Sequence, residues 1–264
     1  MRTRINGLSI NCELAGDKGP YFVMNHGLGG SLARFRDEVP FWSSRFRVLT
    51  WDNRGCGRSD KAEDYTLKLY AQDLALLLEK LGVDSVILFG VSWGGITALR
   101  FTLDYPQMVR FLILDSTSSA VNQQAAINYR ARADMVEQGS LESLLTGMGQ
   151  GFRPAFAGNA DMVSQQEALP DCDAGSYAGA TRAIAGLYEE PMTPELGRIT
   201  CPTLVVGGGK DATAGAAGSI IIHRGIPNSK LVIVQDAGHG VYRLKPDLFR
   251  QTVLEFLADN GLVQ

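Results

Sequence analysis

Short apolar segments alternate with longer stretches of helical periodicity along most of the chain. Apolar runs of strand length cover residues 21–25, 46–51, 85–90, 109–114, 202–207 and 230–235. Apolar positions recur at helical spacing over residues 31–44, 66–81, 93–105, 214–224 and 246–260. Residues 2–13 alternate weakly and precede a glycine-rich turn cluster, which predicts an N-terminal hairpin. Strand–helix alternation predicts an α/β fold with a mostly parallel central sheet flanked by helices.

The alternation of strands and helices is interrupted in the middle of the chain. Residues 117–196 carry no strand signal, and their periodicity predicts four short helices, over residues 122–138, 141–149, 162–168 and 177–189. We therefore expect a four-helix insertion between two strands, at one end of the sheet. It divides the chain into a first core part (1–116), the helical insertion (117–196) and a second core part (197–264).

Composition narrows the class of protein. The chain has 264 residues, 45% of them hydrophobic and 20% charged, which is ordinary for a globular protein with a sizeable core. A formal net charge of -3 offers no basic surplus for nucleic acid, so we expect no nucleic-acid partner. The four cysteines are scattered without paired spacing, so we expect buried thiols in a reducing compartment, with no disulfide framework and no zinc site.

Nothing in the sequence indicates targeting. The first seven residues are positively charged, but no apolar segment typical of a secretory signal follows them. Every apolar run is far shorter than the ~20 residues that span a bilayer. We therefore expect a cytoplasmic protein with no membrane partner, and the sequence leaves a homo-oligomer open.

A G-x-S-x-G pattern follows the apolar run 85–89 and opens the next predicted helix. It comprises Gly90, Ser92 and Gly94. In a strand–turn–helix context this pattern exposes a serine hydroxyl at the carboxyl edge of the sheet, and its small residues leave room for a sharp bend. The amide groups at the start of the following helix favour a developing anion. Ser92 is therefore our candidate nucleophile.

A second glycine-rich loop, residues 25–31, follows the strand-like run 21–24 and begins Asn-His-Gly. Such a loop can turn backbone N–H groups toward a cavity, and acyl transfer needs two such donors for the oxyanion. We assign them to the backbone N–H groups of Leu28 and Trp93. His26 lies beside these glycines, so we expect it to have a structural hydrogen-bonding role, and its use as the catalytic base is an open alternative.

The base and the acid come from the last third of the chain. His239 lies between Gly238 and Gly240 after the strand-like run 230–235, in a loop that can bring its imidazole to Ser92. A serine hydroxyl needs such a base, and the base needs a carboxylate on its other ring nitrogen. Asp211, after the run 203–206, is our candidate acid.

Alternatives to these two residues remain open. Asp115 ends another apolar run and is a second candidate acid. Asp236 is close to His239 along the chain and is typical of a turn. His223 falls in a predicted helix, where surface exposure is the simpler interpretation.

These motifs in this order resemble the α/β-hydrolase superfamily over residues 5–257. Residues 52–59 (DNRGCGRS) are similar to the D-x-R-G-x-G-x-S loop of that superfamily, which packs under the active site without being catalytic. The resemblance implies an α/β-hydrolase fold, a catalytic triad in the order Ser92, Asp211, His239, and a lid formed by residues 117–196. It implies a metal-free serine hydrolase without a cofactor.

Within the superfamily, the short lid resembles small carboxylesterases and 3-oxoadipate enol-lactonases. The expected substrate is a small carboxylic ester or lactone. The acid loop departs from the common pattern, because Asp211 is followed by Ala-Thr-Ala where Thr-Pro is usual.

Four other functions stay open. Residues 52–59 and 92–94 are also similar to proline iminopeptidases, although those carry His-Gly-Gly-Pro-Gly where this chain has His-Gly-Leu-Gly-Gly. Acids that could bind a substrate amine there are Glu137, Glu142, Glu167 and Glu189. Carbon–carbon bond hydrolases and cofactor-free haloperoxidases share the triad residues, and a ligand-binding protein could use the same fold.

Overall fold

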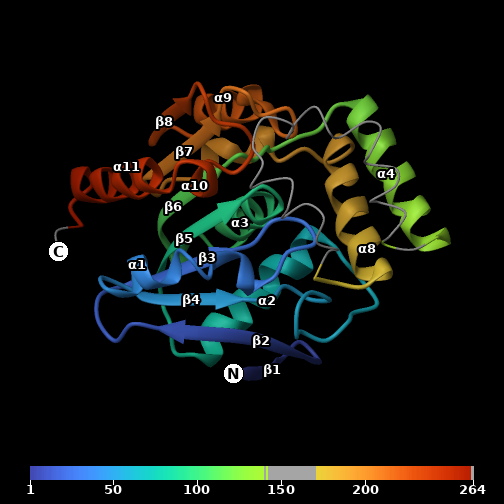
Figure 1. Ribbon diagram of the computed structural model, residues 1–264, viewed down its shortest axis with the longest axis horizontal. Helices are drawn as coiled ribbons and strands as arrows, with labels where there is room; N and C mark the ends of the chain where they lie inside the picture. Colours follow the sequence, from blue (N-terminus) through green and yellow to red (C-terminus); the bar gives the residue numbers. More distant parts are fainter. Residues whose placement is uncertain (140, 142–170, 263–264) are drawn as a thin grey trace.

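The computed structural model describes residues 1–139, 141 and 171–262 (Figure 1). Their strands form one eight-stranded sheet in the order β1-β2-β4-β3-β5-β6-β7-β8. The strands are β1 Arg2–Ile5, β2 Leu8–Ala15, β3 Tyr21–Asn25, β4 Arg47–Trp51, β5 Val86–Val91, β6 Val109–Asp115, β7 Thr203–Gly208 and β8 Ser229–Val234. β1 and β2 pair antiparallel, as does β2 with β4, and the other pairs are parallel. The predicted hairpin and the mostly parallel sheet are confirmed.

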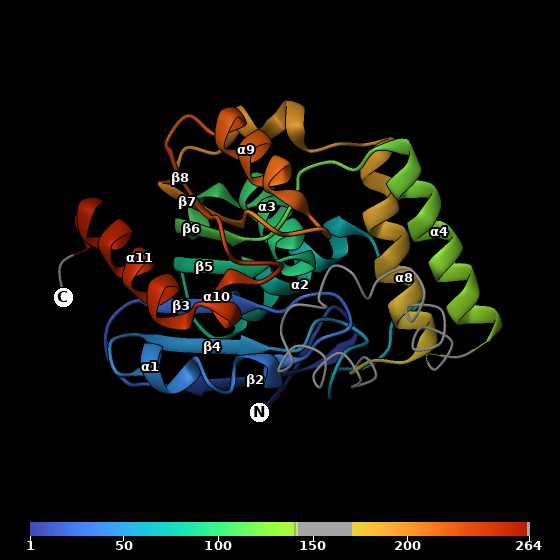
Figure 2. The ribbon, with the colours of Figure 1, turned by 45° about the horizontal axis from the view of Figure 1, so that its top comes forward.

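Helices cover both faces of the sheet (Figures 1 and 2). One face packs against α2 Leu67–Lys80, α3 Trp93–Asp104 and α9 Gly215–Gly225. The other packs against α1 Val39–Ser43, α10 Val241–Leu244 and α11 Pro246–Asp259. The short 3₁₀ segments are η1 Leu32–Phe35, η2 Pro106–Met108, η3 Gly186–Tyr188 and η4 Thr193–Arg198.

The central strands are apolar on both sides because both sides are covered. Along β5, Val86 and Leu88 join the core beneath α2 and α3, whereas Ile87 and Phe89 join the core beneath α11. Every residue of β5 is buried. A strand covered on both faces reads as a continuous apolar run, which is the signal that predicted it.

One predicted helix is wrong. The pattern over residues 31–44 predicts a single helix, but the structure has η1 and then α1. Pro40 lies in the first turn of α1. Proline has no amide hydrogen and its ring crowds the preceding turn, so a helix can begin at Pro40 but cannot run through it. The short helix α10 was also not predicted.

Of the four helices expected in residues 117–196, two are described. They are α4 Gln123–Gln138 and α8 Ala174–Ala185, the latter continued by η3. The predicted helices 141–149 and 162–168 fall largely or wholly outside the described residues. Figures 1 and 2 show α4 and α8 side by side beyond one end of the sheet. In the part of the chain that is described, no helix is long and apolar enough to cross a membrane.

Candidate functional site

Ser92 occupies a strained turn between β5 and α3. Its backbone lies at φ 55 and ψ -120, a conformation that residues other than glycine rarely adopt. The Ser92 N–H donates to the carbonyl oxygen of Asp115 at 2.9 Å, and Thr117 Oγ1 donates to the Ser92 carbonyl at 2.7 Å. Bonds to the segment that ends β6 therefore hold the turn in place. Such strain is concentrated at functional sites.

The glycines around Ser92 are required by close packing. A Cβ atom on Gly90 would lie 2.3 Å from the Gly94 carbonyl oxygen, and one on Gly94 would lie 2.1 Å from the Asn25 carbonyl oxygen. A Cβ on Gly95 would meet the Thr117 side chain at 2.6 Å. The G-x-S-x-G pattern thus follows from backbone segments that touch one another on either side of the turn.

The loop that contains Leu28 lies beside Ser92. A Cβ placed on Gly27 would be 3.7 Å from the Ser92 Cβ, and Leu28 packs against Val136 of α4 and Tyr177 of α8. The loop therefore lies between the serine turn and the two described helices of the 117–196 segment. The ring of Trp93 packs edge-on against Tyr70 at 5.0 Å between centroids, which anchors the start of α3 in the core.

His26 is fully buried and is held by backbone groups. The Asn53 N–H donates to His26 Nε2 at 3.1 Å, so Nδ1 carries the proton and donates to the Gly27 carbonyl at 2.9 Å. Burial lowers the pKa of His26 and keeps the ring neutral. The His26 ring thus joins the loop 52–59, through Nε2, to the loop 25–31, through Nδ1, in agreement with the expected structural role.

The structure brings Asp211 and His239 together. His239 Nδ1 lies 2.9 Å from Asp211 Oδ2. Asp211 Oδ1 accepts the N–H groups of Thr213 at 2.8 Å and Ala214 at 3.0 Å, which fixes the carboxylate. Burial opposes ionisation of this carboxyl, but the bonds from His239 and the two amides outweigh it and lower its pKa. The Asp211 side chain is therefore a buried anion aimed at the imidazole.

The other acids and histidines considered have different roles. The Asp115 carboxylate accepts the N–H groups of Val241 and Tyr242 at the start of α10. Asp236 pairs with Lys245 at 2.6 Å, and its side chain is largely exposed. His223, near the end of α9, is half-buried, and its Nδ1 lies 2.8 Å from Ser229 Oγ.

Two of the lid acids weighed as amine-binding groups are described, and both are paired with arginines at the surface. Glu137 accepts from Arg182 at 2.5 Å, and Glu189 accepts from Arg130 at 2.6 Å. Glu142 and Glu167 lie outside the described residues. The pairing of Glu137 and Glu189 agrees with solvated helix faces.

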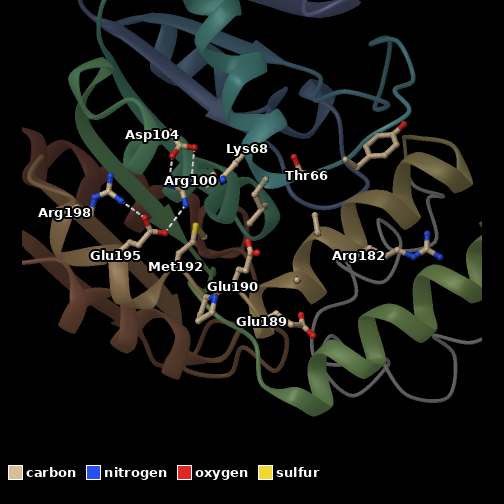
Figure 3. A pocket seen from close by; sticks show the side chains of 15 residues that line it. Thr66, Lys68, Arg100, Asp104, Arg182, Glu189, Glu190, Met192, Glu195 and Arg198 are labelled. Carbon is tan, nitrogen blue, oxygen red and sulfur yellow. Dashed lines mark hydrogen bonds and ion pairs between the residues drawn. The ribbon is translucent and has the colours of Figure 1, made fainter.

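A groove of about 850 Å³ lies on another part of the surface (Figure 3). Arg100 stands at its wall, bonded to Asp104 and, at 3.1 Å, to Glu195. Its lining comprises Tyr65, Thr66, Leu67, Lys68, Arg100, Asp104, Arg182, Ala183, Gly186, Glu189, Glu190, Pro191, Met192, Glu195 and Arg198. This set contains none of the five predicted site residues, so the groove is separate from the candidate site. Among the residues that the structure describes, no cluster of three or more His, Cys, Asp or Glu side chains could hold a metal ion.

Comparison with known proteins agrees with this architecture. A profile described as alpha/beta hydrolase fold matches residues 20–148, and one described as TAP-like protein matches residues 185–262. The chain has the alpha/beta hydrolase fold. Its homology to individual hydrolases is distant. It is 28% identical over 261 residues to 3-oxoadipate enol-lactonase 1 of Acinetobacter baylyi, covering 97% of this chain and 96% of the relative.

Two solved structures are similar over nearly the whole α/β hydrolase chain. A hydrolase from Pseudomonas aeruginosa PA01 has a TM-score of 0.87 and 28% identity, covering 97% of each chain. A thermophilic esterase from Thermogutta terrifontis has a TM-score of 0.85 and 26% identity, covering 98% of this chain and 96% of the esterase.

Proposed function

We propose that this α/β hydrolase cleaves a small carboxylic ester or lactone through an acyl-enzyme intermediate. The observation that carries the proposal is the hydrogen bond from the His239 imidazole to the buried Asp211 carboxylate, in a chain that holds Ser92 in a strained turn. Ser92, Asp211 and His239 follow β5, β7 and β8, and the carboxyl ends of parallel strands share one edge of the sheet.

Each residue has a defined step in the proposed reaction. His239 Nε2 takes the proton of the Ser92 hydroxyl as its oxygen attacks the carbonyl carbon. Asp211 holds the proton on Nδ1 and stabilises the imidazolium that forms. The N–H groups of Leu28 and Trp93 bind the oxyanion. The imidazolium protonates the leaving alcohol, and a water molecule, activated by the same base, releases the acid.

The substrate class is supported by the relatives and by the surroundings of the loop. One relative is named an enol-lactonase, and one similar structure is an esterase. Leu28 packs against Val136 and Tyr177, which supports an apolar roof over the loop. We propose that residues 117–196 are the lid that supplies this roof, between the core parts 1–116 and 197–264.

The test is hydrolysis of p-nitrophenyl acetate by Ser92→Ala. Loss of the nucleophile should lower kcat by about 10⁶-fold, to the level left by the oxyanion donors and substrate binding. Ser85→Ala is the matched control, because Ser85 is exposed just before the opposite end of the same strand. Activity of Ser92→Ala equal to that of the wild type would refute the proposal.

A second experiment separates the proposal from the alternatives. A panel of esters, lactones, proline anilides and carbon–carbon cleavage substrates should show turnover of the first two classes only. Ser92 should also be labelled by a fluorophosphonate, which requires an activated serine. Proline anilide cleavage above the ester rate would favour the aminopeptidase, and absence of labelling would favour a ligand-binding protein.

A further inference from the structure

The backbone that follows His239 is held by two consecutive side chains at the end of β6. Ser116 Oγ accepts the Gly240 N–H at 2.9 Å, and the Asp115 carboxylate accepts the N–H groups of Val241 at 3.2 Å and Tyr242 at 2.9 Å. The Ser116 hydroxyl in turn donates to Asp115 Oδ1 at 2.8 Å. The three successive backbone N–H groups after His239, the proposed base, are thus bonded to the side chains of Asp115 and Ser116 at the end of β6.

The end of β6 is also bonded to the turn that contains Ser92 and to β7, the strand that precedes Asp211. The Asp115 carbonyl accepts the Ser92 N–H at 2.9 Å, and the Ser116 N–H donates to the Val206 carbonyl at 2.9 Å. Ser116 has φ 52, which is unusual for a residue other than glycine. The end of β6 therefore connects the three segments that carry Ser92, Asp211 and His239.

Asp115 is fully buried, and burial raises its pKa to about 6 against the opposing effect of the bonds it accepts. A buried carboxylate is costly, and a neutral side chain of the same shape would avoid that cost. This cost points to a requirement for two strong acceptors at this position.

We propose that Asp115 and Ser116 are positioning residues that set the place of His239 relative to Ser92. The proposal rests on the proposed function, because it assigns the pair a role in the same reaction. Both side chains are buried, so neither is placed to touch the substrate. Each acts by fixing the loop from which the imidazole projects, and a small displacement of a catalytic group is enough to slow a reaction.

The first test is Asp115→Asn, which keeps the shape but replaces one acceptor with a donor facing an amide. We expect kcat for p-nitrophenyl acetate to fall by about 10- to 100-fold with KM unchanged. The rate of fluorophosphonate labelling should fall in parallel, while the final fraction of labelled protein stays complete. A purely structural defect would instead lower the final labelled fraction.

Ser116→Gly keeps the proposal testable if Asp115→Asn does not fold. Glycine suits the positive φ at this position, so the melting temperature should be retained while the acceptor for Gly240 is lost. A lower kcat at an unchanged melting temperature is the expected result. Once Ser92→Ala has proved inactive in the same assay, wild-type kcat in both variants overturns the positioning role and leaves the proposed function intact.

Two cysteines that are far apart in the sequence lie opposite each other in the structure. Cys56 of the loop 52–59 faces Cys172, just before α8, in an antiparallel bridge. The Gly57 N–H donates to the Asp171 carbonyl at 2.5 Å, which makes the two cysteines a non-hydrogen-bonded pair. Cα atoms in such pairs are typically about 4.5 Å apart, within the range that a disulfide spans. The structure has no bond between the two sulfurs, and their mutual hydrogen bond and burial raise the pKa of Cys56.

The segment that carries Cys172 is bonded to the loop that contains Leu28. The Asp171 N–H donates to the Gly29 carbonyl at 2.7 Å, and Ser31 Oγ donates to the Asp171 carboxylate at 2.9 Å. Cys172 is half-buried, whereas Cys56 is buried. A small oxidant can therefore reach Cys172 first.

We infer that Cys56 and Cys172 are a reversible redox site, oxidised to a disulfide by a hydroperoxide. The Cys172 thiolate attacks the peroxide oxygen and becomes a sulfenic acid, which releases the first water when hydrogen peroxide is the oxidant. The Cys56 sulfur then attacks that sulfur, and the second water leaves with the sulfenic oxygen. Two thiols lose two electrons and two protons, and the peroxide is reduced by two electrons.

The test is brief exposure of the native protein to hydrogen peroxide, followed by thiol alkylation under denaturing conditions and mass spectrometry. We expect two of the four thiols to be lost, a peptide pair joined through Cys56 and Cys172, and full recovery with dithiothreitol. Cys172→Ser should keep its remaining thiols, whereas Cys201→Ser, which removes the other half-buried cysteine, should form the bridge as the wild type does. Separate alkylation of Cys56 and Cys172 after treatment, or irreversible sulfinic acid at Cys172, would overturn the inference.

Discussion

Arg54 and Asp73 form a bidentate ion pair in the interior, with bonds of 2.7 and 2.8 Å and almost no exposure of either side chain. Arg54 belongs to the loop 52–59, and Asp73 lies on the buried face of α2. The same loop donates the Asn53 N–H to His26, which in turn supports the loop that contains Leu28. The ion pair therefore anchors the loop 52–59, which supports the loop that contains Leu28 through His26.

Removal of one partner should be far more damaging than removal of both. Asp73→Leu leaves a buried guanidinium without its carboxylate, and we expect a loss of about 3–5 kcal/mol in the free energy of unfolding. The double variant Arg54→Met, Asp73→Leu should recover more than half of that loss, because no buried charge remains. Urea unfolding of both variants measures this. Equal stability of the single and double variants would contradict the argument.

Asp211→Asn should lower kcat by about 10⁴-fold while the protein stays folded. The amide can present a donor to His239 Nδ1, and this favours the tautomer in which Nε2 carries the proton and cannot act as a base. Ester hydrolysis and a thermal melt measure the two effects. Asp236→Asn is the control, since that exposed carboxylate pairs only at the surface with Lys245. A comparable loss in the control would show that charge near the loop matters, rather than the Asp211 contact.

Local signals in the sequence predicted most of the sheet and its helices. The strands at the centre are covered on both faces, so their continuous apolar runs identify them. Gly82 directly follows the predicted helix 66–81; it has φ 68 and its N–H donates to the Glu79 carbonyl, as a glycine that ends a helix does. The prediction of one helix over 31–44 was wrong because apolar spacing alone does not reveal where a proline interrupts a helix, and Pro40 does so here.

Contacts between distant segments could not be predicted in this way. The bonds from residues 240–242 to Asp115 and Ser116 join parts of the chain more than a hundred residues apart. The only sequence signal was two polar residues after the apolar run 109–114. Cys56 and Cys172 likewise meet only through the folded chain. The Asp211–His239 contact was predicted because each residue follows a strand, and parallel strands bring such positions to one edge.

Gly94→Ala should lower both stability and activity. Its Cβ would lie 2.1 Å from the Asn25 carbonyl oxygen, so the backbone of the serine turn must move away from β3. We expect a loss of about 1–3 kcal/mol in the free energy of unfolding, typical of overpacking, with a fall in kcat of about 100-fold from displacement of Ser92. Urea unfolding and ester hydrolysis measure these.

The matched control for this glycine is Gly186→Ala. Gly186 has helical φ and ψ after α8, and nothing lies within 4 Å of an added Cβ. Alanine there should leave stability unchanged or raise it by up to about 1 kcal/mol, with no effect on kcat. Equal behaviour of the two variants would show that glycine at position 94 is not required by its contact with Asn25.

The pH dependence of stability should contain a contribution from His26. Burial lowers the pKa of His26 in the folded state below 6.5, so the unfolded chain binds a proton first as the pH falls. Stability from this residue is therefore complete above pH 6.5 and is lost as the pH falls toward the folded pKa, by up to about 1.4 kcal/mol per pH unit. Asp115 acts in the opposite sense, since its pKa is raised to about 6 and protonation favours the folded state at lower pH.

The difference between wild type and His26→Gln isolates the histidine, because Asp115 is present in both proteins. Glutamine can accept the Asn53 N–H but does not titrate. Urea unfolding at pH 7.5, 6.5, 5.5 and 5.0 should give a variant whose free energy of unfolding falls less steeply below pH 6.5 than that of the wild type. Parallel curves would mean that His26 binds its proton equally well in the folded and unfolded states. A buried, neutral His26 ring would then not be what joins the loops 25–31 and 52–59.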